Sequence, residues 1–433
     1  MRVVDSSAMS AAATRHPRGL YVLFATELWE RYGFYSLFAI LTLYMTEKLQ
    51  FSEQLAGQVY GAYLGAVYFM PLLGGFLADR VLGYNRAVMS GAIVMGIGYL
   101  AVAAGSVPLF FTGLALVACG SGLLKPNIST IVGNLYRDKQ ELSDSAYNIF
   151  YMGINIGAFL APYGVAYLRA NFGWGPAFAS SAAGMLLALL TFVVFNKDVA
   201  AGAQRNVDSA TPERSPEISE AKRRTIALLV VFAIAVIFWI AFYQNGFTLT
   251  LWARDNTDTT VAPEIFQAVN PLGIILFSPL LVMVWTWLRK RQAEPSTPGK
   301  MLIGLLFTAA VYGVMATAGF VGGDTGKVSS AWLVSAYLLI SVGEICLSPM
   351  GLSLVAKVAP PSRRGMLMGG WFAATSIGGY FAGMLGGMFW NAMPHSRFFL
   401  SVAGLTLVAA VGLAAATAWL RPIFARAMAE RSN

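Results

Sequence analysis

Long, uninterrupted apolar segments dominate the chain, and short polar stretches separate them. A membrane-spanning helix needs roughly 20 consecutive apolar residues, and about twelve segments reach that length. The strands of a membrane β-barrel would alternate apolar and polar residues, which these segments do not. The pattern therefore predicts an all-α integral membrane protein with twelve transmembrane helices. The expected spans are 19–46, 54–80, 87–105, 108–135, 145–169, 174–196, 224–252, 262–288, 300–321, 329–356, 365–391 and 397–420.

The longest polar stretch between spans, residues 198–223, is rich in Pro, Ser and charged residues. It divides the spans into two groups of six, which is the arrangement of a pseudo-symmetric carrier with its substrate site near the middle of the membrane. We therefore expect two six-helix bundles, over 19–197 and 224–421, joined by a cytoplasmic linker at 198–223. Tails at 1–18 and 422–433 complete the predicted organisation.

Composition and charge agree with a membrane protein and indicate its orientation. Hydrophobic residues make up 57% of the chain and charged residues 12%, against about 25% charged in soluble domains. Of the 30 Lys and Arg, 17 lie in five alternate loops and only 5 in the six loops on the other side. Basic loops stay in the cytoplasm, so both termini are expected there. The net charge of +9 is thus a topology signal and does not predict nucleic-acid binding.

Cysteine, the N-terminal segment and glycine each exclude a class of structure. Cys119 and Cys346 both lie in apolar spans, so no disulfide framework is expected. The first 18 residues lack an apolar core with a cleavage site, so the first span itself is expected to direct insertion. The 44 glycines favour close helix packing over a phosphate-binding loop, because "GSG" (120–122) follows no strand.

Five ionisable residues lie inside the spans: Glu27, Glu30, Arg31, Lys125 and Glu344. Each costs roughly 2.5–3.5 kcal/mol near a helix centre, so such residues usually face a cavity and are paired. The first three stand at i, i+3 and i+4, on one face of the first helix. These charges could simply pair and lock helices together, but five of them on three helices favour a functional pocket. Cations on one side and an acid on the other suit a zwitterion such as a peptide.

Seven segments share their order and spacing with the signatures of one transporter family. They are "ELWERYGFYS" (27–36), "GGFLADRVLGYNR" (74–86), "GSGLLKPN" (120–127), "FYMGINIGAF" (150–159), "FQAVNP" (266–271), "SVGEICLSPMGLSLVAKVAP" (341–360) and "GMLMGGWFAATSIGGYFAG" (365–383). Together they resemble the proton-dependent oligopeptide transporter family of the major facilitator superfamily, and 74–86 resembles the gating motif of that superfamily. The resemblance implies a major facilitator fold and proton-coupled import of di- and tripeptides by alternating access. It also implies a bacterial inner-membrane protein that works as a monomer, with no metal or cofactor apart from the coupling proton.

Residue roles follow from the resemblance, position by position. Proton coupling is assigned to Glu27, Glu30, Arg31 and Lys125, of which Arg31 and Lys125 also bind the peptide carboxylate. The peptide's amino group is assigned to Asn155, Asn270 and Glu344. Side-chain pockets are assigned to Tyr35, Tyr68, Trp239, Ser348 and Trp371, although packing or lipid contact would also explain each aromatic. Gating is assigned to Asp79, Arg80 and Arg86 at the cytoplasmic edge.

The sequence departs from the family pattern at three positions. Phe34 stands where a tyrosine is usual, which removes a hydroxyl. Tyr243 replaces a glutamate of several bacterial relatives, and Phe38 replaces the arginine that pairs with it. Both partners of that gate pair are absent together. Asp255, at the outer end of the seventh span, is the expected replacement, with its partner left open.

Carboxylates are expected to carry the coupling proton, because both histidines, His16 and His395, lie outside the predicted spans. We hypothesise that the peptide carboxylate competes with Glu30 for Arg31 and Lys125, so that Glu30 is protonated when peptide binds. Substrate and proton then favour each other's binding, as symport requires.

Other functions remain open at this stage. A carrier of the same fold could take another small anion or zwitterion, such as nitrate or a peptide-like drug. A membrane enzyme is disfavoured because the chain has no Gly-x-Ser-x-Gly, no His-Glu-x-x-His and no Cys/His pair within the spans. A peptide sensor that does not transport would lose the proton carboxylates, and Glu27 and Glu30 are both present.

Overall fold

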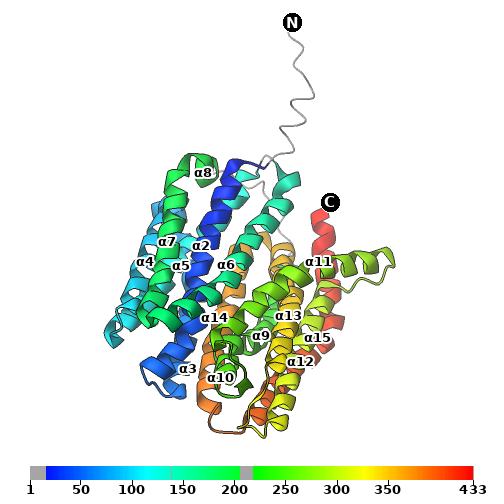
Figure 1. The fold of residues 1–433 in the computed structure, drawn as a ribbon. Helices are drawn as coiled ribbons and strands as arrows, with labels where there is room; N and C mark the ends of the chain where they lie inside the picture. The colour runs from blue at the N-terminus through cyan, green and yellow to red at the C-terminus, as the bar shows by residue number, and fades with distance from the viewer. Residues whose placement is uncertain (1–15, 138, 205–217, 433) are drawn as a thin grey trace. The chain divides into compact units, whose positions relative to one another are not determined.

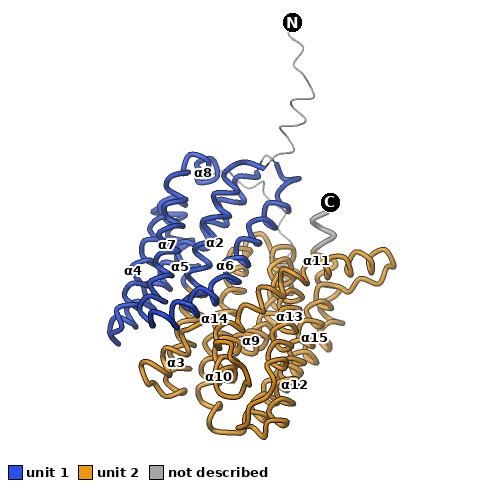
Figure 2. The backbone as a smooth tube through the Cα atoms, viewed as in Figure 1, with its two compact units in different colours: residues 1–37, 70–207 blue, residues 38–69, 208–433 orange. Residues whose placement is uncertain are grey.

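A computed structural model describes residues 16–137, 139–204 and 218–432 of the chain. The described residues are almost entirely helical (Figure 1). They divide into two compact units (Figure 2). Unit 1 is the described part of 1–37 and 70–207, and unit 2 is the described part of 38–69 and 208–433.

Unit 1 contains most of the first half of the chain. The helix α2 (Arg18–Leu43) begins in unit 1 and ends in unit 2, whereas α3 (Glu53–Leu77) begins in unit 2 and ends in unit 1. The elements wholly in unit 1 are η2 (Ala78–Leu82), α4 (Tyr84–Ala103), α5 (Val107–Leu135), η3 (Gln140–Leu142), α6 (Ser143–Phe172), α7 (Trp174–Val194) and α8 (Asn196–Ala203).

Unit 2 contains the second half of the chain together with segment 38–69. Its one small sheet pairs β1 (Thr257–Asp258) with β2 (Val328–Ser329) in parallel, with Thr257 opposite Val328. Its helical elements are η1 (Tyr44–Lys48), α9 (Ile218–Phe242), η4 (Tyr243–Gly246), α10 (Thr248–Asp255), η5 (Pro263–Ala268), α11 (Val269–Lys290), α12 (Thr297–Val321), α13 (Ser330–Val358), η6 (Pro361–Arg363), α14 (Arg364–Phe389) and α15 (His395–Ser432).

Every predicted span falls on one of these helices. Within the described residues, ten helical segments are long and apolar enough to cross a membrane. The two predicted spans outside that group are α2 and α14, each 26 residues long. The charges at Glu27, Glu30 and Arg31 lower the hydropathy of α2, and frequent glycines lower that of α14. The predicted all-α membrane fold is therefore confirmed.

Three boundaries differ from the prediction. The seventh span, expected as one helix, is interrupted at Tyr243–Gly246 by the 3-10 turn η4. Asn245 and Gly246 are poor helix formers, and together with Gln244 they form a short polar break that the predicted span ran through. The last helix continues to Ser432. The predicted linker is helical at both of its described ends, where α8 occupies its start and α9 begins at Ile218. Residues 205–217 of that linker and residues 1–15 of the tail lie outside the described residues, so the predicted domain boundaries stay a prediction.

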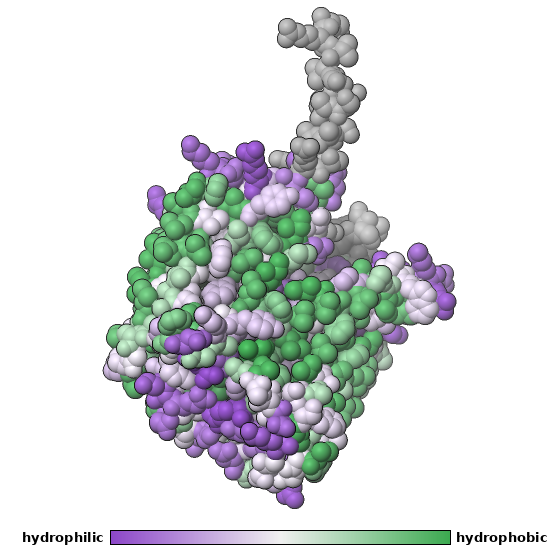
Figure 3. All heavy atoms as spheres, viewed as in Figure 1, coloured by the Kyte–Doolittle hydropathy of each residue, from purple (hydrophilic) through white to green (hydrophobic). Residues whose placement is uncertain are grey.

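The surface of the units is suited to lipid. Val194, Val408 and Val411 are between 67% and 69% exposed, and Figure 3 shows large apolar areas on the viewed face. Contiguous exposed apolar surface of this kind would be a liability in water and is the normal exterior of a membrane helix. The chain is a multi-pass membrane protein.

Glycines bring helices into close contact, as predicted. In unit 1, α4 and α5 touch where Gly91 meets Gly120 and where Gly98 meets Gly113. A Cβ built on Gly91 would lie 2.7 Å from the carbonyl oxygen of Gly120, which is too close for any other residue. Small residues of this kind let membrane helices approach and pack tightly.

Candidate functional site

A buried cluster of charges lies on α2 in unit 1. The side chains of Glu27, Glu30 and Arg31 are only 1%, 0% and 3% exposed. The Nε of Arg31 is 3.3 Å from Oε1 of Glu27. The same guanidinium donates from Nε and Nη2 to the two carboxylate oxygens of Glu30. The predicted common face of these residues is confirmed, and one guanidinium serves two carboxylates.

Lys125 of α5 completes this cluster. It is partly exposed and lies within electrostatic reach of Arg31, Glu30 and Glu27. The cluster thus holds two cations and two carboxylates, which balance in charge. A balanced buried cluster is less costly than isolated charges, and a new anion entering it must displace one of its carboxylates from a cation.

Phe34 occupies the position of the missing tyrosine and contacts the cluster. Its buried ring lies under Arg31, with the guanidinium carbon 5.0 Å from the ring centroid. Such a contact stabilises the cation through the negative face of the ring. Tyr35, the predicted pocket residue beside it, is partly exposed, and its ring centroid lies 5.4 Å from that of Phe34. Phe34 therefore keeps the aromatic face beside Arg31 without a hydroxyl.

The helix α6 packs closely on α2 beside this cluster. A Cβ built on Gly157 would lie 2.3 Å from the carbonyl oxygen of Leu28, so glycine is required at that contact, and it would lie 3.1 Å from Cβ of Arg31. Asn155, two residues before it, is buried, and its Nδ2 donates to the carbonyl of Tyr151 on the same helix at 3.0 Å. Asn155 belongs to unit 1, so its predicted cooperation with Asn270 and Glu344 of unit 2 stays a prediction.

In unit 2, a second polar group joins α11 and α13. Asn270 donates from Nδ2 to Oε2 of Glu344 at 3.2 Å and to Oγ of Ser341 at 3.2 Å. Ser341 in turn donates to the carbonyl oxygens of Asn270 and Tyr337. Asn270 and Glu344 were predicted to act together, and they are in contact. Glu344 is partly exposed, so its carboxylate could also meet a ligand.

Aromatic side chains predicted to line pockets fall into two sets in unit 2. Trp239 stacks on Tyr243 with ring centroids 5.4 Å apart, and the ring centroid of Tyr68 lies 5.5 Å from that of Tyr243. The indole nitrogen of Trp239 is buried without a hydrogen-bond partner among the described residues. Trp371 is only 2% exposed and packs over Gly351. Ser348 is partly exposed, one turn beyond Glu344 on α13.

The predicted cytoplasmic gating residues are at the surface of unit 1. Asp79, Arg80 and Arg86 are all exposed. The guanidinium of Arg80 lies 4.7 Å from the ring centroid of Phe76. Close by in sequence, Asn85 exchanges two hydrogen bonds of 3.1 Å with Asn196 of α8. Their gating role stays a prediction.

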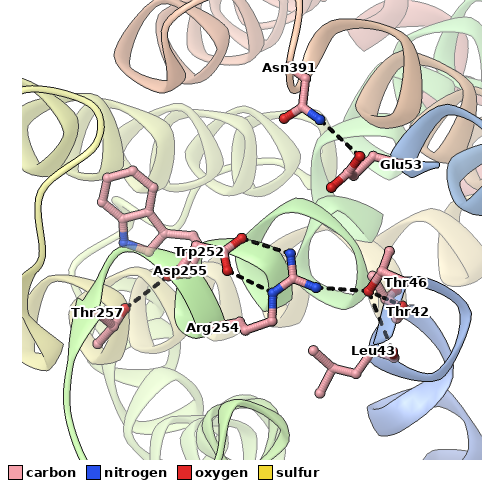
Figure 4. Close-up of polar contacts among 9 residues, drawn as sticks. All are labelled: Thr42, Leu43, Thr46, Glu53, Trp252, Arg254, Asp255, Thr257 and Asn391. Atoms are coloured by element: carbon pink, nitrogen blue, oxygen red, sulfur yellow. Dashed lines mark hydrogen bonds and ion pairs between the residues drawn. The ribbon is translucent and has the colours of Figure 1, made fainter. Parts of the chain in front are cut away.

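The partner of Asp255, left open by the sequence, is its neighbour Arg254. Arg254 donates from Nε and Nη2 to the two oxygens of Asp255 at 2.7 and 2.8 Å, and from Nη1 to Oγ1 of Thr46 at 2.8 Å (Figure 4). Arg254 therefore links the end of α10 to η1, with Asp255 orienting it. Sequence reasoning missed Arg254, whose signal was an adjacent pair of opposite charges at the end of a span.

No group of three His, Cys, Asp or Glu able to hold a metal ion occurs in the part of the chain that the structure describes. Both cysteines are free.

Comparison with known proteins gives consistent matches over nearly the whole chain. The family model described as the POT family matches residues 85–201 and 196–398. The peptide transporter YePEPT of Yersinia enterocolitica is 33% identical over 86% of this chain and 88% of its own length. The dipeptide and tripeptide permease A of Escherichia coli is 30% identical over 94% of this chain and 93% of its own. A crystal structure of a mutant peptide transporter POT in complex with alafosfalin superposes with a TM-score of 0.87 and 31% identity, over 97% and 99% of the two chains.

Proposed function

The chain belongs to the POT family of transporters, and from that premise we propose that it imports di- and tripeptides together with protons. The relatives named above as peptide transporters support the substrate class. The observation that carries the coupling is the buried guanidinium of Arg31, which two carboxylates share within reach of Lys125. That arrangement lets an incoming anion take a cation away from a carboxylate.

The first step is competition for cations. A peptide carboxylate that binds Arg31 and Lys125 forms charge-assisted hydrogen bonds and displaces Glu30 from its guanidinium. A carboxylate left buried without its cation is costly as an anion, so Glu30 takes up a proton. The proton thus enters when peptide binds, and each ligand raises the affinity for the other. Glu27, held 3.3 Å from Arg31, keeps that guanidinium oriented.

The second step concerns the other end of the peptide. Its ammonium group binds Glu344, whose carboxylate is already held by Asn270 at 3.2 Å. Asn155 contributes its amide oxygen, because its Nδ2 is already bonded to the carbonyl of Tyr151. A substrate with both charged ends free would satisfy both groups, whereas nitrate would satisfy only the cations.

The remaining predicted residues recognise side chains or control access. Tyr35, Tyr68, Trp239, Ser348 and Trp371 contact the peptide's side chains, and the unpartnered indole nitrogen of Trp239 supports a polar contact there. Asp79, Arg80 and Arg86 stabilise the state that is closed to the cytoplasm, and Asp255 orients Arg254.

The protein works as a monomer in the bacterial inner membrane with both termini in the cytoplasm. The bias of basic residues toward alternate loops supports that orientation. The proton gradient and the membrane potential drive import, the potential being worth about 2.3 kcal/mol per charge per 100 mV.

The test is uptake of labelled dialanine into liposomes that hold the purified protein, with an inward proton gradient and a negative internal potential. We expect accumulation that a protonophore abolishes and that unlabelled dipeptide competes away. Absence of uptake, with no competition by dialanine in a binding assay on the same preparation, would assign the chain to another solute. Uptake that is indifferent to the protonophore would keep the peptide and reject the proton.

A further inference from the structure

The interruption of the seventh span leaves several backbone carbonyls that side-chain hydroxyls bond. At Tyr243–Gly246 the chain forms a 3-10 turn, and these residues are buried. The last four carbonyl groups of a helix have no backbone N–H four residues later to accept from. In a membrane protein each such group needs another partner, because lipid offers none.

The hydroxyl of Thr250 on α10 donates to the carbonyl of Asn245 at 3.2 Å. Four more hydroxyl groups meet this need, and they come from two different parts of unit 2. Two come from α12 and α13 in the second half of the chain, and two come from segment 38–69. The bonds are Tyr312 Oη to the carbonyl of Ala241, Tyr337 Oη to that of Asn245 at 2.9 Å, Tyr60 Oη to that of Tyr243 at 2.8 Å, and Thr42 Oγ1 to that of Gly246 at 2.6 Å.

Tyr60 also contacts both residues that depart from the family's gate pair. Its ring lies 5.8 Å from that of Phe38 and 5.5 Å from that of Phe247, between centroids. Its hydroxyl bonds the carbonyl of Tyr243. A Cβ at Gly246 would overlap the ring of Phe38 and the hydroxyl of Tyr60. The two positions that lack an arginine and a glutamate are therefore joined through one tyrosine.

The same segment meets α14 through glycines. A Cβ on Gly57 would overlap the backbone of Gly383 and Gly387, and one on Gly61 would overlap the carbonyl of Tyr380. Because the van der Waals attraction between atoms weakens steeply with distance, these contacts stabilise the two helices only while their backbones touch.

We call the surface where segment 38–69 meets the second half of the chain the contact face. Two polar contacts lie at its edges. Arg254 donates to Thr46, and Asn391 donates from Nδ2 to Oε2 of Glu53 at 2.9 Å (Figure 4). Both contacts join segment 38–69 to the second half of the chain. Segment 38–69, although part of the predicted N-terminal bundle, is thus held to the second half by hydrogen bonds and glycine contacts.

We propose that Tyr60 is the positioning residue of the outer gate: with Thr42 and Phe38 it latches segment 38–69 onto the turn Tyr243–Gly246, in place of an ion pair. The proposal rests on the transport function proposed above. Opening to the outside breaks the bonds of Tyr60 and Thr42 and leaves those of Tyr312 and Tyr337 intact. Since hydrogen bonds from a neutral hydroxyl to a carbonyl carry no net charge, the latch is independent of pH, and proton sensing is left to the carboxylates.

The experiment measures the closure directly by the distance between two spin labels. Labels are placed at Gln50→Cys and Thr260→Cys, both exposed in unit 2, in a chain whose Cys119 and Cys346 are replaced by Ser. Tyr60→Phe is expected to raise the fraction with the longer distance about fivefold, the factor that corresponds to about 1 kcal/mol for one hydrogen bond. Thr42→Val is expected to shift the distances in the same direction.

Tyr337→Phe is the matched control, because it removes the same group from the same turn but on the other side of the contact face. It is expected to leave the distances unchanged while lowering the unfolding temperature. Equal distances in the parent, Tyr60→Phe and Thr42→Val would overturn the proposal, as would an equal shift in Tyr337→Phe. An effect of Tyr60→Phe that differs between about pH 5 and about pH 8 would overturn the neutral latch. Because the distances need no substrate, a failure of peptide uptake leaves this result unaffected.

Discussion

The two ends of α2 differ in the kind of side-chain contact that they make. From Glu27 to Phe34, in unit 1, the helix holds a buried guanidinium with two carboxylates and an aromatic ring. From Phe38 onward, in unit 2, it contributes an aromatic ring and the Thr42 hydroxyl that bonds a backbone carbonyl. The first region consists of charged groups that can exchange partners. The second consists of neutral groups that interact only in direct contact.

This difference indicates which of the two regions can respond to protonation. A buried charge responds to any change in its partners, because a low dielectric strengthens every interaction and the loss of one partner is costly. Hydroxyl-to-carbonyl bonds and glycine contacts carry no net charge and act over short distances. The first kind of region suits coupling and the second suits closure.

The largest effect is expected from Glu30→Gln. This change removes the carboxylate that accepts hydrogen bonds from two nitrogens of Arg31. Removing one partner of a buried pair costs about 3–5 kcal/mol, and here it also removes the site that takes up the proton. Proton-driven accumulation of dialanine should be lost, while exchange of labelled for unlabelled peptide stays measurable. Glu141→Gln, at an exposed site, should behave as the parent. Accumulation by Glu30→Gln equal to the parent would reject the coupling role.

Arg31→Lys should separate charge from geometry in the same region. Lysine keeps the positive charge but cannot offer two parallel donors to a carboxylate. Charge-assisted hydrogen bonds are worth about 1.5–3 kcal/mol, so affinity for dialanine should fall roughly 10- to 100-fold. Binding of C-terminally amidated dialanine, measured by competition, should change little. An equal loss for both peptides would reject recognition of the carboxylate.

Gly383→Ala should separate α14 from α3 in the neutral region through a steric clash alone. A Cβ at that position would overlap the backbone of Gly57 and Gly61 on α3. Overpacking costs about 1–3 kcal/mol, so the closed state and the initial rate of uptake should fall about 5- to 100-fold. Gly404→Ala adds the same methyl group where nothing lies within 4 Å and should transport normally. A normal rate in Gly383→Ala would mean that α3 and α14 need not approach so closely.

The sequence predicted the charged region well because its signal is local. Glu27, Glu30 and Arg31 are neighbours by helical spacing, so the period alone brings them together. An ionisable residue in a membrane span is also rare enough to attract attention. Even the pair of Asn270 and Glu344, 74 residues apart, followed from a resemblance that named both positions.

The neutral region could not be predicted in the same way. The bond from Tyr60 to Tyr243 joins residues 183 apart in sequence, and a tyrosine in an apolar span looks like ordinary packing. The interruption at Tyr243–Gly246 directly follows one of the most apolar stretches of the chain, with a mean hydropathy of 2.9 over 18 residues, and the predicted span simply continued through it. The glycine spacing on α3 was visible, but the helix that it meets was not.

The smallest effect is expected from a charge outside the membrane, at Glu294 between α11 and α12. Hydrogen bonds from Arg289, and then from Lys300, lower the pKa of Glu294 to about 2. The distances are 2.6 Å from Nε of Arg289 and 2.7 Å from Nζ of Lys300. Solvent screens such surface pairs, which are typically worth only about 0.2–1 kcal/mol.

Glu294→Gln should therefore lower the unfolding temperature at neutral pH by about 1–3 °C and leave dialanine accumulation unchanged. The folded-state pKa is below the unfolded value of about 4.3, so the stabilisation is complete above pH 4.3. It is lost as the pH falls toward about 2, and the difference between the variant and the parent should shrink over that interval. A difference that stays constant from pH 5 to pH 2.5, about the range that these two pKa values define, would mean that Glu294 stabilises the loop by packing and not by its charge.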